Sequence, residues 1–107
     1  MNRLVLSAAL VERKAPRYTP AGLPALDLSV KHESTVSEDG QARQVSFEMK
    51  AVAIGAVTKQ LAPLEMGSSL LLGGFITSTR NGKGLLFHIT SVELAEPAPA
   101  TNPSGSN

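Results

Sequence analysis

The sequence of 107 residues contains no cysteine, and this excludes several kinds of protein. Without cysteine the chain has no disulfide scaffold, no thiolate metal site and no cysteine nucleophile. No apolar run approaches the ~20 residues that a membrane-spanning helix needs, and no hydrophobic signal region follows Arg3 near the N-terminus. We therefore expect a soluble, cytoplasmic protein.

Net charge and aromatic side chains are also scarce. The chain has 10 Lys+Arg and 9 Asp+Glu, a formal net charge of +1, 4% aromatic residues and no tryptophan. A near-neutral chain has no overall attraction for nucleic acid, so any nucleic-acid site must come from local clustering of cations. Hydrophobic residues make up 42% of the sequence, which is enough for one packed domain of this length.

Alternation of apolar and polar residues predicts strands over most of the chain. The predicted strands are residues 2–12, 23–32, 44–54, 70–76 and 85–94. Leu26, Leu28 and Val30 give the cleanest alternation, and they are expected to face the core. In the third strand the apolar phase changes from Phe47 to Val52 and Ile54, which predicts a bulge near Ala51.

Turn residues and prolines separate these strands. Residues 13–22 contain two prolines and a glycine, which predict an irregular loop. The polar stretch of residues 33–41 is expected to be a connection that ends in the hairpin signal Asp39-Gly40, and Asn81-Gly82 predicts another hairpin turn. Residues 55–66 have helical spacing, but Pro63 limits that helix to about two turns.

These elements predict an all-β fold. Five strands, a bend at Gly73-Gly74 and one short helical segment between strands 3 and 4 are typical of the five-stranded OB-fold barrel, with an unrelated small barrel as the alternative. Residues 1–95 are expected to form this domain, with Phe47, Phe75 and Phe87 in its core. Residues 96–107 are rich in Pro, Ala and Ser and are expected to be a disordered tail.

No pattern in the sequence predicts catalysis, a metal or a cofactor. Glu38 and Asp39 are adjacent carboxylates, but they lie in a polar stretch where solvation keeps both ionised. His32 and His88 are the two histidines, whereas a metal site needs about three or more ligands at fixed spacing. The sequence has no nucleophile elbow and no phosphate-binding glycine loop. We therefore expect a protein without enzymatic activity.

Basic residues do cluster, in two predicted loops that border one face of an OB-fold barrel. Cations on such loops contact phosphates, and an exposed ring beside them stacks on bases, although loop cations also serve solubility alone. Lys31 and Lys50 extend the basic track across the predicted sheet. The candidate nucleic-acid-binding residues are Arg13, Lys14, Arg17, Tyr18, Lys31, Lys50, Arg80 and Lys83.

Several short segments, in this order and spacing, resemble the family of bacterial primosomal replication protein N (PriB). They are Asn2-Arg3-Leu4-Val5-Leu6-Ser7, Pro20-Ala21-Gly22-Leu23-Pro24, Val30-Lys31-His32, Arg43-Gln44 with Met49, Gly67-Ser68, Gly74-Phe75-Ile76, and Asn81-Gly82 with His88. The resemblance covers residues 2–94. It implies a small homodimeric OB-fold protein of the bacterial cytoplasm that binds single-stranded DNA and stimulates the PriA helicase at stalled replication forks. Other primosome proteins and single-stranded-DNA-binding protein are further partners that it implies.

This chain departs from that family at two positions. Relatives carry a tryptophan where this sequence has Ser46, and a basic residue where it has Glu33. The resemblance therefore implies a single-strand site that is weaker or shifted elsewhere. Two alternatives stay open: an OB-fold protein-interaction module with little DNA affinity, and a general single-stranded-DNA-binding protein. The second is disfavoured because such proteins end in an acidic tail, and no acidic residue follows Glu96.

Overall fold

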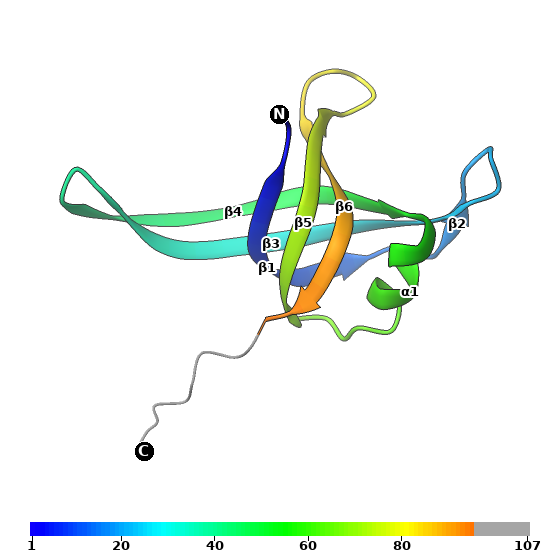
Figure 1. The fold of residues 1–107 in the computed structure, drawn as a ribbon, viewed down its shortest axis with the longest axis horizontal. Helices are drawn as coiled ribbons and strands as arrows, with labels where there is room; N and C mark the ends of the chain where they lie inside the picture. The colour runs from blue at the N-terminus through cyan, green and yellow to red at the C-terminus, as the bar shows by residue number, and fades with distance from the viewer. Residues whose placement is uncertain (96–107) are drawn as a thin grey trace, which may run out of the picture.

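Five long strands close into a barrel, with a short strand beside them, in the computed structural model, which describes residues 1–95 (Figure 1). The strands are β1 (Leu4–Arg13), β2 (Arg17–Tyr18), β3 (Pro24–Glu38), β4 (Gln41–Ile54), β5 (Ser69–Ser78) and β6 (Leu85–Leu94). A short 3₁₀ helix (Gly55–Val57) and α1 (Thr58–Leu61) connect β4 to β5. The predicted tail, residues 96–107, lies outside the described residues.

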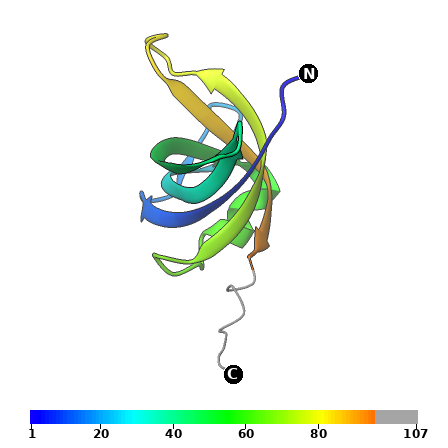
Figure 2. The same cartoon turned by 90° about the vertical axis from the view of Figure 1, so that its left-hand side faces the viewer.

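The barrel closes because β1 pairs on both of its edges. Its first half pairs with β5 and its second half with β3, so the strands follow the cyclic order β1–β3–β4–β6–β5–β1. Among the described strands, β4 and β6 form the one parallel pair. Figure 2 shows the strands curving around a common interior. With its short helix between β4 and β5, this is the OB-fold barrel that the sequence predicted.

Inward-facing side chains from the strands and the helix form one core. Leu26, Leu28 and Val30 of β3 are buried in it, as the alternation predicted, and α1 contributes Leu61. The largest fully buried side chains are those of Phe87, Leu10, Leu26, Leu61, Leu70, Leu72 and Val30. Thr58 is also buried, and its hydroxyl donates a hydrogen bond of 2.7 Å to the carbonyl oxygen of Gly55. The short helix therefore packs against the barrel interior.

Two of the phenylalanines that were predicted in the core lie on the surface. Phe47 and Phe75 are each 39% exposed, and Phe87 is fully buried. Phe75 faces outward because its neighbour Ile76 packs against the core, and successive side chains of a strand point to opposite faces. Phe47 lies in β4 beyond the residues that pair with β6, where less of the barrel covers it.

The predicted bulge near Ala51 is also wrong. The register between β3 and β4 runs without a shift from the pair Ala25–Ile54 to the pair Glu38–Gln41. Ala51 and Ala53 continue the inward series and are buried, whereas Ile54 is exposed. Because these inward positions hold alanine and not a large apolar residue, the larger Val52 and Ile54 looked like the inward-facing residues, and the sequence wrongly indicated a bulge. The observed register shifts lie in β1 between Leu10 and Glu12, and in β5 between Gly73 and Gly74.

Two predicted loops contain regular structure. Strands β3 and β4 continue through the polar residues to form a long hairpin, which projects from the barrel (Figure 1). We call residues 33–46 the arm. The predicted turn at its tip is confirmed, because Asp39 and Gly40 both have positive φ, 51° and 78°. The loop predicted over residues 13–22 contains β2, which pairs with Ala25 and Pro24 of β3.

Gly74 leaves less room for a Cβ atom than any other glycine in the described residues. A Cβ atom placed there would lie 1.8 Å from the carbonyl oxygen of His88 and 3.0 Å from the ring of Phe87. The register shift at this point leaves Thr90 as the extra residue, since Gly73 pairs with Ser91 and Gly74 pairs with Ile89. A backbone oxygen cannot move aside as a side chain can, so this position requires glycine.

We therefore expect Gly74→Ala to lower the free energy of unfolding by at least ~1–3 kcal/mol, because the methyl group would overlap the β6 backbone. Urea denaturation of the wild type and the variant measures this difference. Gly84→Ala is the matched control in the same hairpin, since its Cβ would meet Thr79 only at 3.4 Å. The control should change stability by less than ~0.5 kcal/mol. Equal effects of the two substitutions would contradict the assignment.

Candidate nucleic-acid interface

The outer face of β3 and β4 carries charges of both signs. The register places Lys31 opposite Glu48, Lys50 opposite Ser29, and Glu33 opposite Ser46. The outward residues of this face are Asp27, Ser29, Lys31 and Glu33 on β3, with Ser46, Glu48 and Lys50 on β4. Three carboxylates therefore accompany two lysines. The face on which bases stack in OB-folds has no aromatic ring among these residues and no excess of positive charge.

The structure places Arg13 away from the position expected of a phosphate contact. Its side chain is half-buried, and Nη1 donates hydrogen bonds to the carbonyl oxygens of Leu61, at 3.2 Å, and Leu64. These carbonyls lie at the end of α1, where helical partners run out. Arg13 thus links β1 to the helix. Its partners are backbone atoms from a distant part of the chain, which no pattern around Arg13 could show.

Arg17 is held on the surface by a carboxylate of the neighbouring strand. Its Nε donates to Asp27 Oδ2 at 2.7 Å, and its Nη2 donates to Asp27 Oδ1 at 3.1 Å. The short strand β2 positions the guanidinium, because Arg17 pairs with Ala25, two residues before Asp27. The hydrogen bond from Arg17 lowers the pKa of Asp27, and the same bond raises the pKa of Arg17. A phosphate that binds Arg17 must therefore compete with Asp27.

Tyr18 and Lys14 lie on the same side of the barrel as this ion pair. Tyr18 is 74% exposed, as the sequence predicted, so its ring is accessible. Lys14 lines a small cavity of about 140 Å³ together with Glu12, Asp27 and Lys50. The two lysines at this site are thus accompanied by two carboxylates.

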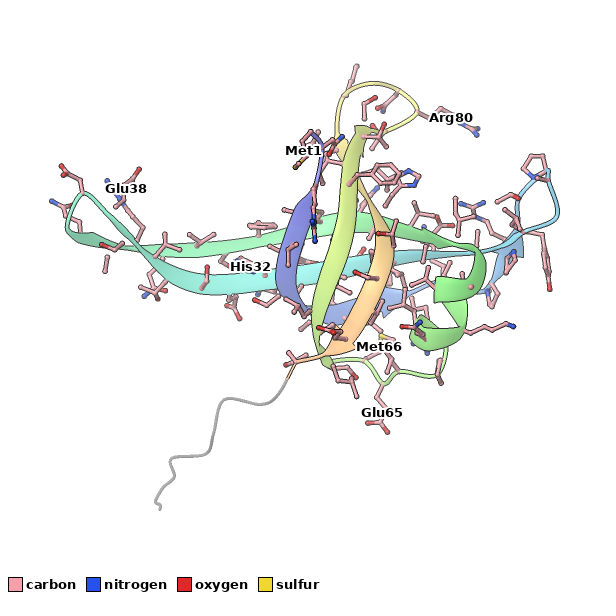
Figure 3. The ribbon with its side chains drawn as sticks, in the orientation of Figure 1. Met1, His32, Glu38, Glu65, Met66 and Arg80 are labelled. Atoms are coloured by element: carbon pink, nitrogen blue, oxygen red, sulfur yellow. The ribbon has the colours of Figure 1, made fainter. Side chains whose placement is uncertain are left out.

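The β5–β6 loop holds the remaining two predicted cations. Thr79 and Asn81 shape this loop: the Thr79 hydroxyl donates to Asn81 Oδ1 at 2.7 Å, and the Lys83 backbone N–H donates to the same oxygen at 3.0 Å. Gly82 has a φ of 74°, and its N–H donates to the Thr79 carbonyl oxygen, so the turn centres on Arg80 and Asn81, one residue before the predicted Asn81-Gly82 centre. In the part of the chain that the structure describes, Arg80 and Lys83 have no carboxylate within 4.0 Å. Figure 3 shows Arg80 extending away from the barrel.

Both histidines have neighbours in the fold. His32 contacts the carbonyl oxygen of Ser7 through Nδ1 at 2.6 Å and the hydroxyl of Ser34 through Nε2 at 2.7 Å, and it lies beside the Phe47 ring. His88 stacks on Phe75 with 4.7 Å between the ring centres and 12° between the ring planes. Neither side chain belongs to a cluster of three or more potential metal ligands within residues 1–95.

Over the described residues, no helix is both long enough and apolar enough to cross a bilayer.

The pKa of Asp27 leads to a test of the Arg17–Asp27 pair. Because the carboxyl pKa is lower in the folded state, the pair stabilises the protein fully above about pH 4, and the contribution is lost as pH falls through the folded-state pKa. Asp27→Asn should therefore lower stability slightly near neutral pH, and the difference from wild type should vanish in acid. Urea titrations across this range measure it; a difference that persists at ~pH 2 would contradict the assignment.

Comparison with known proteins agrees with the barrel. A family described as "another single-strand binding protein family" matches residues 2–91. Replication restart protein PriB of Bordetella pertussis is 45% identical over 80 residues, 75% of each chain, and that of Nitrosomonas europaea is 30% identical over 94 residues, 87% of each chain. The crystal structure of PriB from Ralstonia solanacearum superposes with a TM-score of 0.79 at 38% identity, covering 88% of this chain and 97% of that one. The chain therefore belongs to the PriB family of OB-fold, single-strand-binding-type proteins.

Proposed function

We propose that this protein binds single-stranded DNA as an accessory of replication restart and stimulates the PriA helicase at stalled forks in the bacterial cytoplasm. The relatives named for replication restart and the match to a single-strand binding family support this role. The observation that carries it is the β5–β6 loop, where Arg80 and Lys83 are exposed and form no ion pair among the described residues. The role is binding rather than catalysis.

The loop cations are the main phosphate contacts in this proposal. The exposed ring of Tyr18 supplies a second contact. Lys14 lines a cavity with Glu12 and Asp27, so it contributes less than a cation without carboxylate neighbours. Arg17, Lys31 and Lys50 lie among carboxylates, so they contribute less than their number suggests. Arg13 has its hydrogen bonds in the protein and contributes least. The binding is therefore electrostatic and tolerant of sequence.

Binding of oligo-dT at several salt concentrations tests this role. Each phosphate contact contributes about −0.7 to the slope of log K against log salt on a single strand. The double variant Arg80→Ala/Lys83→Ala should flatten the slope by about 1.4 and weaken all oligonucleotides alike. Asp27→Asn should have the opposite effect on affinity. It frees Arg17 from its ion pair, so it should tighten binding and steepen the salt slope by up to ~0.7.

Two results would overturn this role. Affinity that does not depend on salt, or that is unchanged in the loop variant, would show that the loop does not contact phosphate. If the wild type does not bind oligo-dT but still accelerates unwinding of a forked DNA by PriA, the protein is an OB-fold interaction module. This second candidate is favoured by the mixed charges of the β3–β4 face and by Ser46 at its surface.

We also propose a homodimer formed through β1. Residues 4–8 of β1 pair with β5 on one edge, while β3 pairs with β1 only from Ala9 onward. On its other edge this half-strand has no paired strand among the described residues, although His32 contacts the Ser7 carbonyl oxygen there, and Val5 is 55% exposed. The same strand of a second copy fits this edge, because two copies of one segment paired antiparallel satisfy two-fold symmetry.

Sedimentation equilibrium of the full chain at micromolar concentration should therefore give twice the chain mass of 11.2 kDa. Val5→Lys should shift the equilibrium toward the monomer, because it places a charge in the interface. A wild-type mass near that of one chain would rule out the dimer.

A further inference from the structure

A stacked aromatic pair lies on the outer face of β5 and β6. Phe75 and His88 are directly opposite in the antiparallel register, with 4.7 Å between ring centres and 12° between ring planes. Phe75 is 39% exposed, whereas the adjacent pair, Ile76 and Phe87, faces the core. The sequence pattern assigned Phe75 to the core and gave His88 too few partners for a metal site, so neither was a candidate site residue.

The register shift between Gly73 and Gly74 creates this pair. If the register before Gly73 had continued, Gly74 would lie opposite Thr90 and Phe75 opposite the buried Ile89. The close approach of the His88 carbonyl to Gly74 removes one residue from the pairing and brings His88 opposite Phe75. The backbone register therefore holds the two side chains opposite each other before any ligand binds, which lowers the entropy cost of binding.

Positive charge flanks the pair on two sides. The loop with Arg80 and Lys83 begins four residues after Phe75, which is ~14 Å along the strand. Arg3 lies on the other side, since it precedes Leu4, which pairs with Gly74. Arg3 and Phe75 also line one open groove of about 580 Å³ above the two glycines, with the carboxylate Glu93 as a further lining residue. An exposed ring between cations is the arrangement that binds a single strand, with bases on the ring and phosphates on the cations.

We propose that Phe75 and His88 form a base-stacking platform for single-stranded nucleic acid, which takes the place of the aromatic residue missing at Ser46. This inference rests on the proposed function and names a second part of the same interface. A base stacks on the exposed side of the Phe75 ring, and His88 supports the ring from the other side. The sugar-phosphate backbone of the nucleic acid then continues to Arg80 and Lys83 in one direction and to Arg3 in the other.

Phe47 provides a matched control for Phe75. It has the same exposed fraction, 39%, and it also lies beside a histidine, with 5.1 Å between the ring centres of Phe47 and His32. It belongs to β4, next to the arm, and not to the hairpin that carries the loop cations. Phe75→Leu should weaken oligo-dT binding by about fivefold or more, the effect of ~1 kcal/mol of lost stacking, with an unchanged salt slope. Phe47→Leu should leave the affinity unchanged.

Tryptophan substitutions report the contact directly, because the chain contains no tryptophan. The indole introduced by Phe75→Trp should bind oligo-dT at least as tightly as the wild type, and its fluorescence should be quenched on binding. The indole introduced by Phe47→Trp should not be quenched. Thermal melts of all four full-length variants show whether each one keeps the wild-type fold.

Each outcome decides the proposal. If the wild type binds oligo-dT but Phe75→Leu binds equally well, or as weakly as Phe47→Leu, the platform is wrong and the proposed function stands. If the wild type does not bind, both fall together. If Phe75→Leu changes the mass in sedimentation rather than the DNA affinity, the face is an interface between copies of this chain, and the platform is also wrong.

Discussion

The barrel depends on the close approach of the His88 carbonyl oxygen to Gly74. This oxygen occupies the space that the Cβ atom of any other residue would need. This approach shifts the β5–β6 register by one residue at the point where Gly74 also pairs with Leu4 of β1. The extra residue, Thr90, lies in β6, so β6 bends beside the point where β5 pairs with both of its neighbours. The same shift brings His88 opposite Phe75, which already faces outward by the alternation along β5, so the ring pair depends on the register at Gly74.

The fold was predictable where one face of a strand is buried and the other is solvated. In the barrel part of β3, Leu26, Leu28 and Val30 alternate with polar residues, and their burial follows directly. In the arm both faces of the hairpin are exposed to solvent, so its sequence does not alternate between apolar and polar residues. The composition of this long hairpin was therefore that of a loop. At Ala51 and Ala53 the prediction failed for a different reason. These inward-facing core positions hold small residues, so the sequence pattern does not mark them as part of the inward-facing series.

The candidate site was less predictable because its properties depend on contacts between distant residues. The cations of the β5–β6 loop could be placed from Asn81-Gly82, since a hairpin turn is a local signal. The competition of Asp27 for Arg17, and of helix carbonyls for Arg13, depends on pairings that local sequence does not contain. Phe75 lies in a strand that is apolar on both faces, where alternation cannot assign a side. The family resemblance predicted the fold and a class of ligand, and we propose that the main contacts lie on β5, β6 and their loop.

The arm affects how this protein unfolds locally. Its residues pair only with each other, beyond the last β1 partner of β3 at Lys31 and the first β6 partner of β4 at Ala51. Their backbone hydrogen bonds can break from the turn inward without any loss of core contacts. Amide hydrogens of the arm therefore exchange with solvent through local fraying, whereas those of the barrel part of the same two strands exchange only when the whole domain unfolds.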